Sequence, residues 1–313
     1  MFFVIVLVTG AGGFIGSHLV RRLTKLGHDV HILVRPESTP ERIADLLPQL
    51  TRHDGAMTDE ESIRRCVENA KPNGIFHLAA SNIQTGMRAS DEDVITTNVL
   101  GMARLLSATK DLPYDFFIHT GSFLEYGMKA KPMTEADVCE PSELYSISKL
   151  AATLLASAAG RTSKKPVLTF RIFTPYGPHI QKGRLIEQII RRALSGEDIP
   201  LTQPTVTRDF LYVIDIVDLL IEGMEKAKEH AGAIFNAGSG HSVTLRTVVD
   251  EILAQTQSVS TPQWNAFPPV LYDTALCQAD MTRTFAAFRW RPAHSLSEGL
   301  RETIDSFRFS AHS

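Results

Sequence analysis

The stretch Val8-Thr9-Gly10-Ala11-Gly12-Gly13-Phe14-Ile15-Gly16 decides the fold, because it joins an apolar run to a helical one through closely spaced glycines. The apolar run, residues 2–8, is expected to be a buried strand, and residues 15–26 are expected to be a helix. Glycines at such a junction allow a tight turn and a close approach of backbone to a pyrophosphate. The helix N-terminus then favours negative charge. A ligand-free structural turn is the alternative, but a strand before and a helix after the motif favour dinucleotide binding.

Short apolar runs alternate with helical stretches through the first half of the chain, for example at residues 31–34, 74–79, 116–119 and 167–173. This alternation is typical of a parallel sheet covered on both faces. We expect an α/β fold with a doubly wound parallel (Rossmann) sheet and a smaller, interleaved C-terminal substrate domain. The dinucleotide-binding domain is expected to take residues 1–173 plus 211–238, and the substrate-binding domain residues 174–210 plus 239–308.

Composition excludes several classes of protein. The 313 residues carry 32 Lys and Arg against 35 Asp and Glu, and this balance argues against nucleic acid or an anionic membrane as partner. Cys66, Cys139 and Cys277 have neither metal-ligand spacing nor the even count of a disulfide framework, so we expect no metal and a reducing cytoplasm. The apolar residues 2–8 lack the basic flank and cleavage site of a signal peptide and are too short to span a membrane.

Tyr145 and Lys149 are four residues apart at an expected helix start, so both project from one face. A free phenol has a pKa of about 10, and a neighbouring ammonium lowers it toward the range useful for acid–base catalysis. Such pairs also occur by chance in surface helices. Ser122 follows the strand at residues 116–119, at the sheet edge where α/β proteins present their sites. Taken alone, that serine is more typical of a stabilised turn.

The end of the second strand selects the nicotinamide cofactor, because it reaches the adenosine ribose. Val34 stands where NAD enzymes place a carboxylate, and the Arg35 guanidinium suits a 2′-phosphate. Alternatively, Arg35 only solvates the strand end. We therefore expect NADP(H), with NAD as the other possibility.

The spacing Gly10-x-x-Gly13-x-x-Gly16, together with residues 14–19 and the Tyr-x-x-x-Lys pair, resembles the extended short-chain dehydrogenase/reductase family. This is the NAD(P)-dependent epimerase/dehydratase family, whose members modify nucleotide sugars. Residues 171–178, 208–213 and 289–300 extend the resemblance over nearly the whole chain. It implies a homodimer formed through a four-helix bundle of residues 94–109 and 145–159, for which Ala151, Ala152 and residues 156–159 are small enough, although internal packing explains them equally well.

The resemblance also implies roles for individual residues. The catalytic set is Ser122, Tyr145, Lys149 and Asn98. Substrate contacts come from Ser122, Thr174 and Arg208; for Arg208 the alternative is an ordinary salt bridge. Cofactor contacts, with Arg35 added from the argument above, come from Gly10, Gly13, Phe14, Ile15, Gly16, Arg35, Asp54, Leu78, Ala79, Ala80, Tyr145 and Lys149.

Departures from the family pattern narrow the reaction. Sugar dehydratases carry an Asp-Glu pair directly after the position of Ser122, but here Phe123-Leu124 cannot move protons. We expect an oxidoreductase that reduces a 4-keto(-6-deoxy)hexose nucleotide, with Tyr145 donating the proton. A 4-epimerase with tightly bound NAD is the alternative, and an idle dinucleotide sensor is a third. Thr174 stands where the family usually has an asparagine, and Val270, within residues 269–273, stands where it usually has an arginine. A substrate other than a nucleotide sugar is therefore a further alternative.

Overall fold

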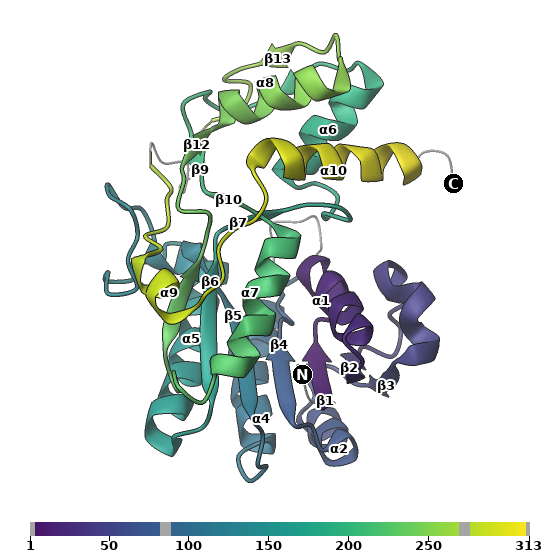
Figure 1. Ribbon diagram of the computed structural model, residues 1–313, viewed down its shortest axis with the longest axis vertical. Helices are drawn as coiled ribbons and strands as arrows, with labels where there is room; N and C mark the ends of the chain where they lie inside the picture. Colours follow the sequence, from purple (N-terminus) through teal and green to yellow (C-terminus); the bar gives the residue numbers. More distant parts are fainter. Residues whose placement is uncertain (1–3, 82–88, 269–275, 311–313) are drawn as a thin grey trace. The chain divides into compact units, whose positions relative to one another are not determined.

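The computed structural model describes residues 4–81, 89–268 and 276–310 (Figure 1). Its central sheet has seven strands in the order β11-β6-β5-β4-β1-β2-β3. The pairs from β5 across to β3 are parallel. Strand β1 therefore lies between β2 and β4, and the chain reverses its winding direction there, which is where doubly wound sheets bind ligands. The strands are β1 (Ile5–Thr9), β2 (Asp29–Val34), β3 (Thr51–Asp54), β4 (Gly74–His77), β5 (Phe116–Ser122), β6 (Val167–Ile172) and β11 (Ile234–Ala237).

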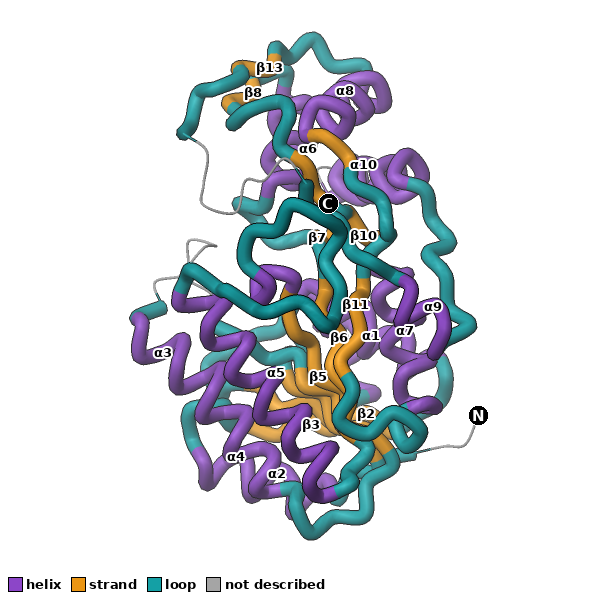
Figure 2. Tube along the Cα trace, turned by 90° about the vertical axis from the view of Figure 1, so that its left-hand side faces the viewer, coloured by secondary structure: helices purple, strands orange, loops and turns teal. Residues whose placement is uncertain are grey.

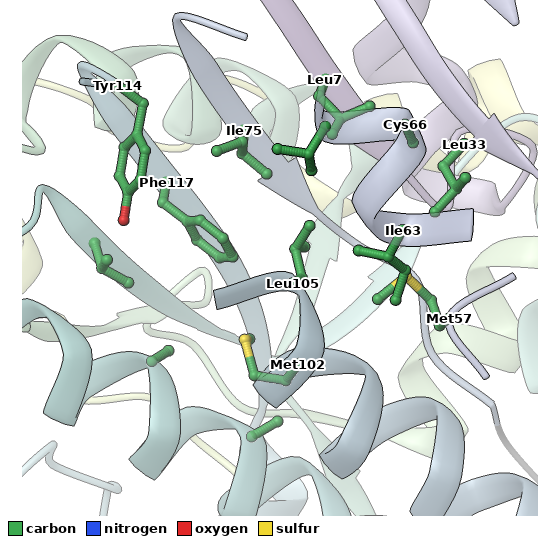
Figure 3. Packing of buried hydrophobic residues seen from close by; sticks show 14 residues of the cluster. Leu7, Leu33, Met57, Ile63, Cys66, Ile75, Met102, Leu105, Tyr114 and Phe117 are labelled. Carbon is green, nitrogen blue, oxygen red and sulfur yellow. The ribbon is translucent and has the colours of Figure 1, made fainter. Parts of the chain in front are cut away.

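Helices cover both faces of this sheet because successive strand residues point to opposite sides. Leu7, Ile75 and Phe117 are in register across β1, β4 and β5 and share one buried cluster, drawn in Figure 3. Helices α2 (Glu60–Ala70), α4 (Gly101–Ala108) and α5 (Leu144–Ser163) complete the cluster from one side. On the other side, α7 (Val213–Lys226) packs closely on β6 at Gly223, where a Cβ would lie 2.7 Å from the Phe170 ring.

Helix α1 (Phe14–Lys25) follows β1 and lies beside α7, to which Arg22 is joined by an ion pair with Asp218 at 3.5 Å. A 3-10 helix, η1 (Glu41–Gln49), connects β2 to β3. Figure 2 shows α3 (Asp91–Ile95), α4 and α5 side by side. Between α3 and α4 the chain forms a π-helical turn, η3 (Thr96–Leu100). None of the helices in the described ranges is long and apolar enough to cross a membrane.

The chain divides into two compact units. The first contains residues 1–125, 143–171 and 217–235, and the second residues 126–142, 172–216 and 236–313. The second unit pairs β7 (Thr174–Tyr176) with β10 (Phe210–Tyr212), β9 (Thr207–Arg208) with β12 (Val243–Thr244), and β8 (Ile199–Pro200) with β13 (Pro262–Gln263). Its helices are α6 (Leu185–Ser195), α8 (Leu245–Thr256), α9 (Thr282–Ala287) and α10 (Leu296–Ser310). The domain limits given from the sequence stay a prediction.

The expected parallel, doubly wound α/β sheet is confirmed. Two details differ from the sequence analysis. The helix expected over residues 94–109 begins at Asp91, where Ser90 and Asp93 form a capping box, and it is interrupted by the π-helical turn. Strand β3 was not expected, because an edge strand can be largely polar and so lacks an apolar pattern. Residues 2 and 3 of the first apolar run lie outside the described ranges.

Candidate active site

The glycine loop lies directly on the backbone that follows β4. Gly10 has φ +77°, and a Cβ there would lie 2.6 Å from the Ala79 nitrogen and from the Leu78 carbonyl carbon. A Cβ on Gly16 would lie 2.1 Å from the Gly10 oxygen, so α1 also packs closely on the loop. Gly13 begins α1 without a side-chain cap, and the first turn has no acidic residue. The positive end of this helix is therefore not offset by a carboxylate of its own first turn.

The chain after β4 completes this part of the site. Leu78 donates its N–H to the Thr9 carbonyl at 3.0 Å, and Ala79 is half-buried while Ala80 is exposed. Thr9 Oγ1 lies 2.7 Å from His77 Nδ1, which ties the ends of β1 and β4 together. The predicted contacts of the glycine loop and of residues 78–80 thus lie next to one another at the strand ends, as cofactor binding requires.

Ser122 is the last residue of β5 and is 8% exposed. Its Oγ accepts the Leu124 N–H at 3.2 Å, and its own N–H donates to Glu125 Oε1 at 2.7 Å. The hydroxyl thus stabilises a turn, which is the alternative role given for Ser122 from the sequence. The bond to Leu124 uses only its acceptor capacity, so its proton can still be donated toward a substrate oxygen.

Tyr145 and Lys149 lie one turn apart at the beginning of α5, which starts with a capping box formed by Glu143 and Ser146. Tyr145 is half-buried, whereas Lys149 is 3% exposed. The Lys149 Nζ donates to the Thr120 carbonyl at 2.6 Å. This bond joins α5 to β5 two residues before Ser122, and it places the lysine at the same strand end.

Burial sets the charges around Lys149. It lowers the pKa of Lys149 to about 8, although the Glu125 carboxylate acts in the opposite direction. The His77 and His119 rings are stacked, with centroids 5.5 Å apart. Burial lowers the pKa of His77 to about 3 and holds the pKa of His119 well below its usual range, and the Lys149 charge adds to both effects. Both imidazoles are therefore neutral near pH 7, next to a buried ammonium.

Asn98 is buried in the π-helical turn. Its Oδ1 accepts the Ser81 N–H at 2.7 Å, and its Nδ2 donates to the Ser81 carbonyl at 3.0 Å and to Ser148 Oγ at 2.9 Å. Ser148 directly precedes Lys149. Asn98 therefore holds the loop after β4 and the beginning of α5 in a fixed relation, and π-helical turns are frequent at such functional positions.

The chain after β2 carries Arg35 and Arg42, and Arg42 contacts the glycine loop. Val34 is buried at the strand end, and Arg35 is exposed. Arg42, on η1, donates to the Gly12 carbonyl at 3.3 Å, and burial lowers its pKa. Sequence reasoning missed Arg42, although three arginines within residues 35–52 were a usable signal.

Arg52 on β3 was also missed. It donates to the carbonyls of Arg35, Pro36 and Ser38 and holds the predicted cofactor residue Asp54 in an ion pair at 2.7 Å. Asp54 is exposed at the end of β3, and its carboxylate is paired with Arg52.

Of the three predicted substrate residues, Ser122 belongs to the first unit, and Thr174 and Arg208 belong to the second. Thr174 opens β7 and donates its N–H to the Asp209 carbonyl at 2.9 Å. Its Oγ1 is buried without a hydrogen-bond partner among the described residues. Arg208, on β9, donates to the Thr207 carbonyl at 2.8 Å. Thr174 is thus hydrogen-bonded to the residue that follows Arg208, whereas Val270 lies outside the described residues.

Among the residues that the structure describes, no group of three or more His, Cys, Asp or Glu side chains could hold a metal ion. Cys66, Cys139 and Cys277, all within the described ranges, form no disulfide with one another.

Comparison with known proteins gives three kinds of match. A family model described as "NAD dependent epimerase/dehydratase family" matches residues 6–238. A UDP-N-acetyl-alpha-D-glucosaminuronate decarboxylase of Bacillus cytotoxicus is 30% identical over 96% of this chain and 97% of its own. Two solved structures are similar over the whole chain. UDP-glucose 4-epimerase of Thermotoga maritima with UDP-glucose has a TM-score of 0.88 and 26% identity, covering 98% and 99% of the two chains. MoeE5 in complex with UDP-glucuronic acid and NAD has a TM-score of 0.85 and 28% identity, covering 97% and 99%.

Proposed function

Because the chain belongs to the NAD-dependent epimerase/dehydratase family of extended short-chain dehydrogenases/reductases, we propose that it moves hydride between a nicotinamide cofactor and a nucleotide-linked sugar. The observation that carries the proposal is the position of Lys149, a buried ammonium bonded to Thr120 beside Ser122 and one helical turn after Tyr145. A lysine with only a structural role would be more stable with its ammonium in solvent, since burying that charge is costly. The burial of this one is explained if it serves a bound ligand.

The residues present fit a dinucleotide. The space into which a Cβ on Gly10 would project lies against the backbone of Leu78 and Ala79, and the N-terminus of α1 suits a pyrophosphate. The nicotinamide supplies or accepts the hydride when it is bound. Tyr145 and Lys149 would hold its ribose, with Gly13 and residues 78–80 along the rest of the cofactor.

The protein's own groups handle the proton. Tyr145 Oη gives a proton to the sugar oxygen as a ketone becomes an alcohol, or takes it in the reverse direction. The Lys149 ammonium stabilises the phenolate form of Tyr145, since an adjacent positive charge favours the anion. The Ser122 hydroxyl donates a hydrogen bond to the same sugar oxygen and orients it. Phe123 and Leu124 offer no further acid or base, so elimination of water is not part of the proposal.

We propose NADP(H) as cofactor and reduction of a 4-keto(-6-deoxy)hexose nucleotide as reaction. Three features support this: the uncharged Val34, the exposed Arg35, and the Arg42 guanidinium next to Gly12. Cells keep NADPH for reductions. The second candidate is a 4-epimerase with tightly bound NAD, and it is favoured by the likeness to UDP-glucose 4-epimerase and to MoeE5 with NAD.

Arg208 is the residue proposed to bind the substrate diphosphate, because a guanidinium can donate two hydrogen bonds to phosphate oxygens. Thr174 is assigned to the same substrate. Its buried Oγ1 supports this, since a ligand oxygen or nitrogen would give it a partner.

A homodimer is part of the proposal. Leu100 on η3 and Ile147 and Leu154 on α5 are 44%, 46% and 51% exposed, which is high for large apolar side chains. Ile147 and Leu154 are seven residues apart and share a helix face, and α5 lies beside η3 and α4. Ala152 and Ala156 pack in the protein core, so these two alanines serve internal packing. A cytoplasmic location also stays a prediction.

The first test is a cofactor inventory. The purified protein is denatured, any released nicotinamide is identified, and emptied protein is titrated with NADPH and NADH. An exchangeable site that prefers NADPH supports the reductase, and turnover is then assayed with 4-keto-6-deoxyhexose nucleotides. Tightly retained NAD contradicts the reductase and makes the epimerase the leading function.

A second test addresses the acid. Tyr145→Phe is expected to lower turnover by about 100-fold or more, the usual contribution of a positioned proton donor. Cofactor affinity is expected to change little, because the ring and Lys149 remain. Unchanged turnover would remove Tyr145 from the mechanism.

A further inference from the structure

Glu125, which the sequence analysis did not single out, lies completely buried just after β5. We propose that it is a positioning residue that holds Ser122 and supports the charged state of Lys149, and this rests on the proposed function of those two residues. Glu125 itself touches no reacting atom in this proposal. It acts by joining the three elements that surround the predicted catalytic groups.

Three elements donate to the Glu125 carboxylate. Oε1 accepts the Ser122 N–H at 2.7 Å, at the end of β5, and Thr153 Oγ1 at 2.9 Å, from α5. Oε2 accepts Arg171 Nε at 2.7 Å, from β6. Thr153 is four residues after Lys149 and so lies one helical turn along the same face. One carboxylate therefore fixes both the Ser122 backbone and the helix that carries Tyr145 and Lys149.

The local sequence makes room for this carboxylate. A Cβ on Gly121 would lie 2.6 Å from Glu125 Oε1 and 3.0 Å from Thr153 Oγ1. Any side chain at that position would displace the carboxylate from its partners. The absence of a side chain at Gly121, directly before Ser122, thus matches the presence of a buried acid four residues after that glycine.

Packing alone does not explain a fully buried ion pair. Taking a carboxylate and a guanidinium out of water is costly, and proteins with apolar residues of similar volume in their place are often as stable or more stable. Glu125 and Arg171 are 0% and 3% exposed. Such a pair is better explained by what its charge and its directed hydrogen bonds do for neighbouring groups.

The neighbouring group that needs a negative charge is Lys149. It faces the neutral His77 and His119 from β4 and β5, and Tyr145 precedes it on its own helix. Glu125 is the carboxylate that raises the pKa of Lys149 against the effect of burial. The Arg171 guanidinium pairs with Oε2, while Oε1 accepts from Ser122 and from Thr153 of α5.

Glu125→Gln tests the charge and keeps the shape, since the amide oxygen can still accept from Ser122 and Thr153. Because this variant leaves Arg171 buried without its carboxylate, the double variant Glu125→Gln/Arg171→Met removes both charges and keeps a packed interior. Thr153→Val is the matched control, which removes one hydrogen bond to the same carboxylate and leaves its charge. Circular dichroism and thermal unfolding establish that each variant is folded.

The first readout is the pKa of Lys149 in the cofactor-free protein, followed by NMR of ¹³Cε-labelled lysine and assigned with Lys149→Met. We expect it to fall from about 8 by roughly one unit in the single variant, as for a lost opposite charge, and by less in the double variant, which also removes the Arg171 charge. Thr153→Val is expected to leave it in place. An unchanged Lys149 pKa in both folded Glu125 variants overturns the proposal.

The second readout separates this proposal from the proposed function. With a turned-over sugar nucleotide, the Glu125 variants are expected to lower kcat by about tenfold while KM changes little, and to move the alkaline limb of the pH profile to lower pH. If Thr153→Val lowers kcat as much as the Glu125 variants do, and the alkaline limb does not move in any of them, the charge of Glu125 has no role in turnover. If the wild-type protein turns over no sugar nucleotide but the Lys149 pKa still falls, the proposed function fails while the link between Glu125 and Lys149 stands.

Discussion

Lys149 Nζ lies 2.6 Å from the Thr120 carbonyl oxygen, so the backbone of β5 holds the ammonium of α5 in place before any ligand arrives. A hydrogen bond from a charged donor inside a protein is strong and directional. The lysine is therefore preorganised, and in the proposed mechanism its charge state governs cofactor binding and the protonation of Tyr145.

The first prediction follows from the pKa of Lys149. Its value of about 8 lies below that of a free lysine, so the ammonium is present below pH 8 and is lost as pH rises through that value. Because the proposed function has the ammonium bond the cofactor ribose, affinity for the nicotinamide cofactor is expected to fall by roughly tenfold between pH 7 and pH 9.5. Fluorescence titrations over this range measure it. Lys149→Met is expected to bind weakly and without pH dependence there, and an equally steep decline in that variant assigns the effect to another group.

The second prediction concerns Arg35 and Arg42, the two arginines proposed to bind a 2′-phosphate. Arg35→Ala and Arg42→Ala are each expected to weaken NADPH binding by about tenfold or more, since a charged hydrogen bond to a 2′-phosphate is lost. NADH, which has no such phosphate, is expected to bind almost as before. Arg64→Ala serves as control, because Arg64 is exposed on α2 and pairs only locally with Glu61 and Glu68. Equal losses for both cofactors would remove the argument for NADP(H).

The third prediction compares two glycines with a similar positive φ, at which any other residue would be strained. Gly10 and Gly27 have φ of +77° and +84°, but a Cβ on Gly27 meets nothing within 4 Å, whereas one on Gly10 meets Ala79 and Leu78. Gly27→Ala is expected to cost only about 1 kcal/mol of stability. Gly10→Ala adds an overpacking cost of about 1–3 kcal/mol and closes the loop to a cofactor. Thermal unfolding and cofactor titration measure both effects. Equal loss of cofactor binding in the two variants would contradict a cofactor-binding role of the Gly10 loop.

The fourth prediction addresses the dimer. Ile147→Glu or Leu154→Glu would place a charge on the exposed apolar face of α5, and burying it at an interface is costly. We expect each variant to elute as a monomer near 34.6 kDa and the wild type at about twice that mass in light scattering. Val259→Glu, at an 89% exposed valine of the second unit, is expected to remain dimeric. A monomeric wild type would refute the dimer.

The sequence predicted those parts of the fold and candidate site whose signal is local. The glycine loop and the start of its helix form one short stretch of sequence, and the Tyr145–Lys149 pair forms another. Within each stretch, turn and helix geometry set the spacing of the residues. The alternating apolar runs in the same way predicted the sheet.

The remainder depends on contacts between distant residues. Glu125 and Arg171 are 46 positions apart, and Arg42 and Gly12 are 30 apart, so no periodicity reports on either contact. A buried glutamate is also indistinguishable from a surface one in a single sequence. Strand β3 is stabilised by pairing with β2 rather than by apolar residues of its own, which left no pattern to detect.

The π-helical turn at Thr96–Leu100 changes the rotational phase of the helix in which it lies. Val94, Asn98 and Met102 are spaced by four residues and are all buried. In a regular α-helix eight residues overshoot two turns by about 80°, so the first and last of these would diverge around the axis. The wider turn absorbs that rotation. Deleting one residue from this segment would therefore force a choice between aligning Asn98 with its serine partners and keeping Met102 in the interior.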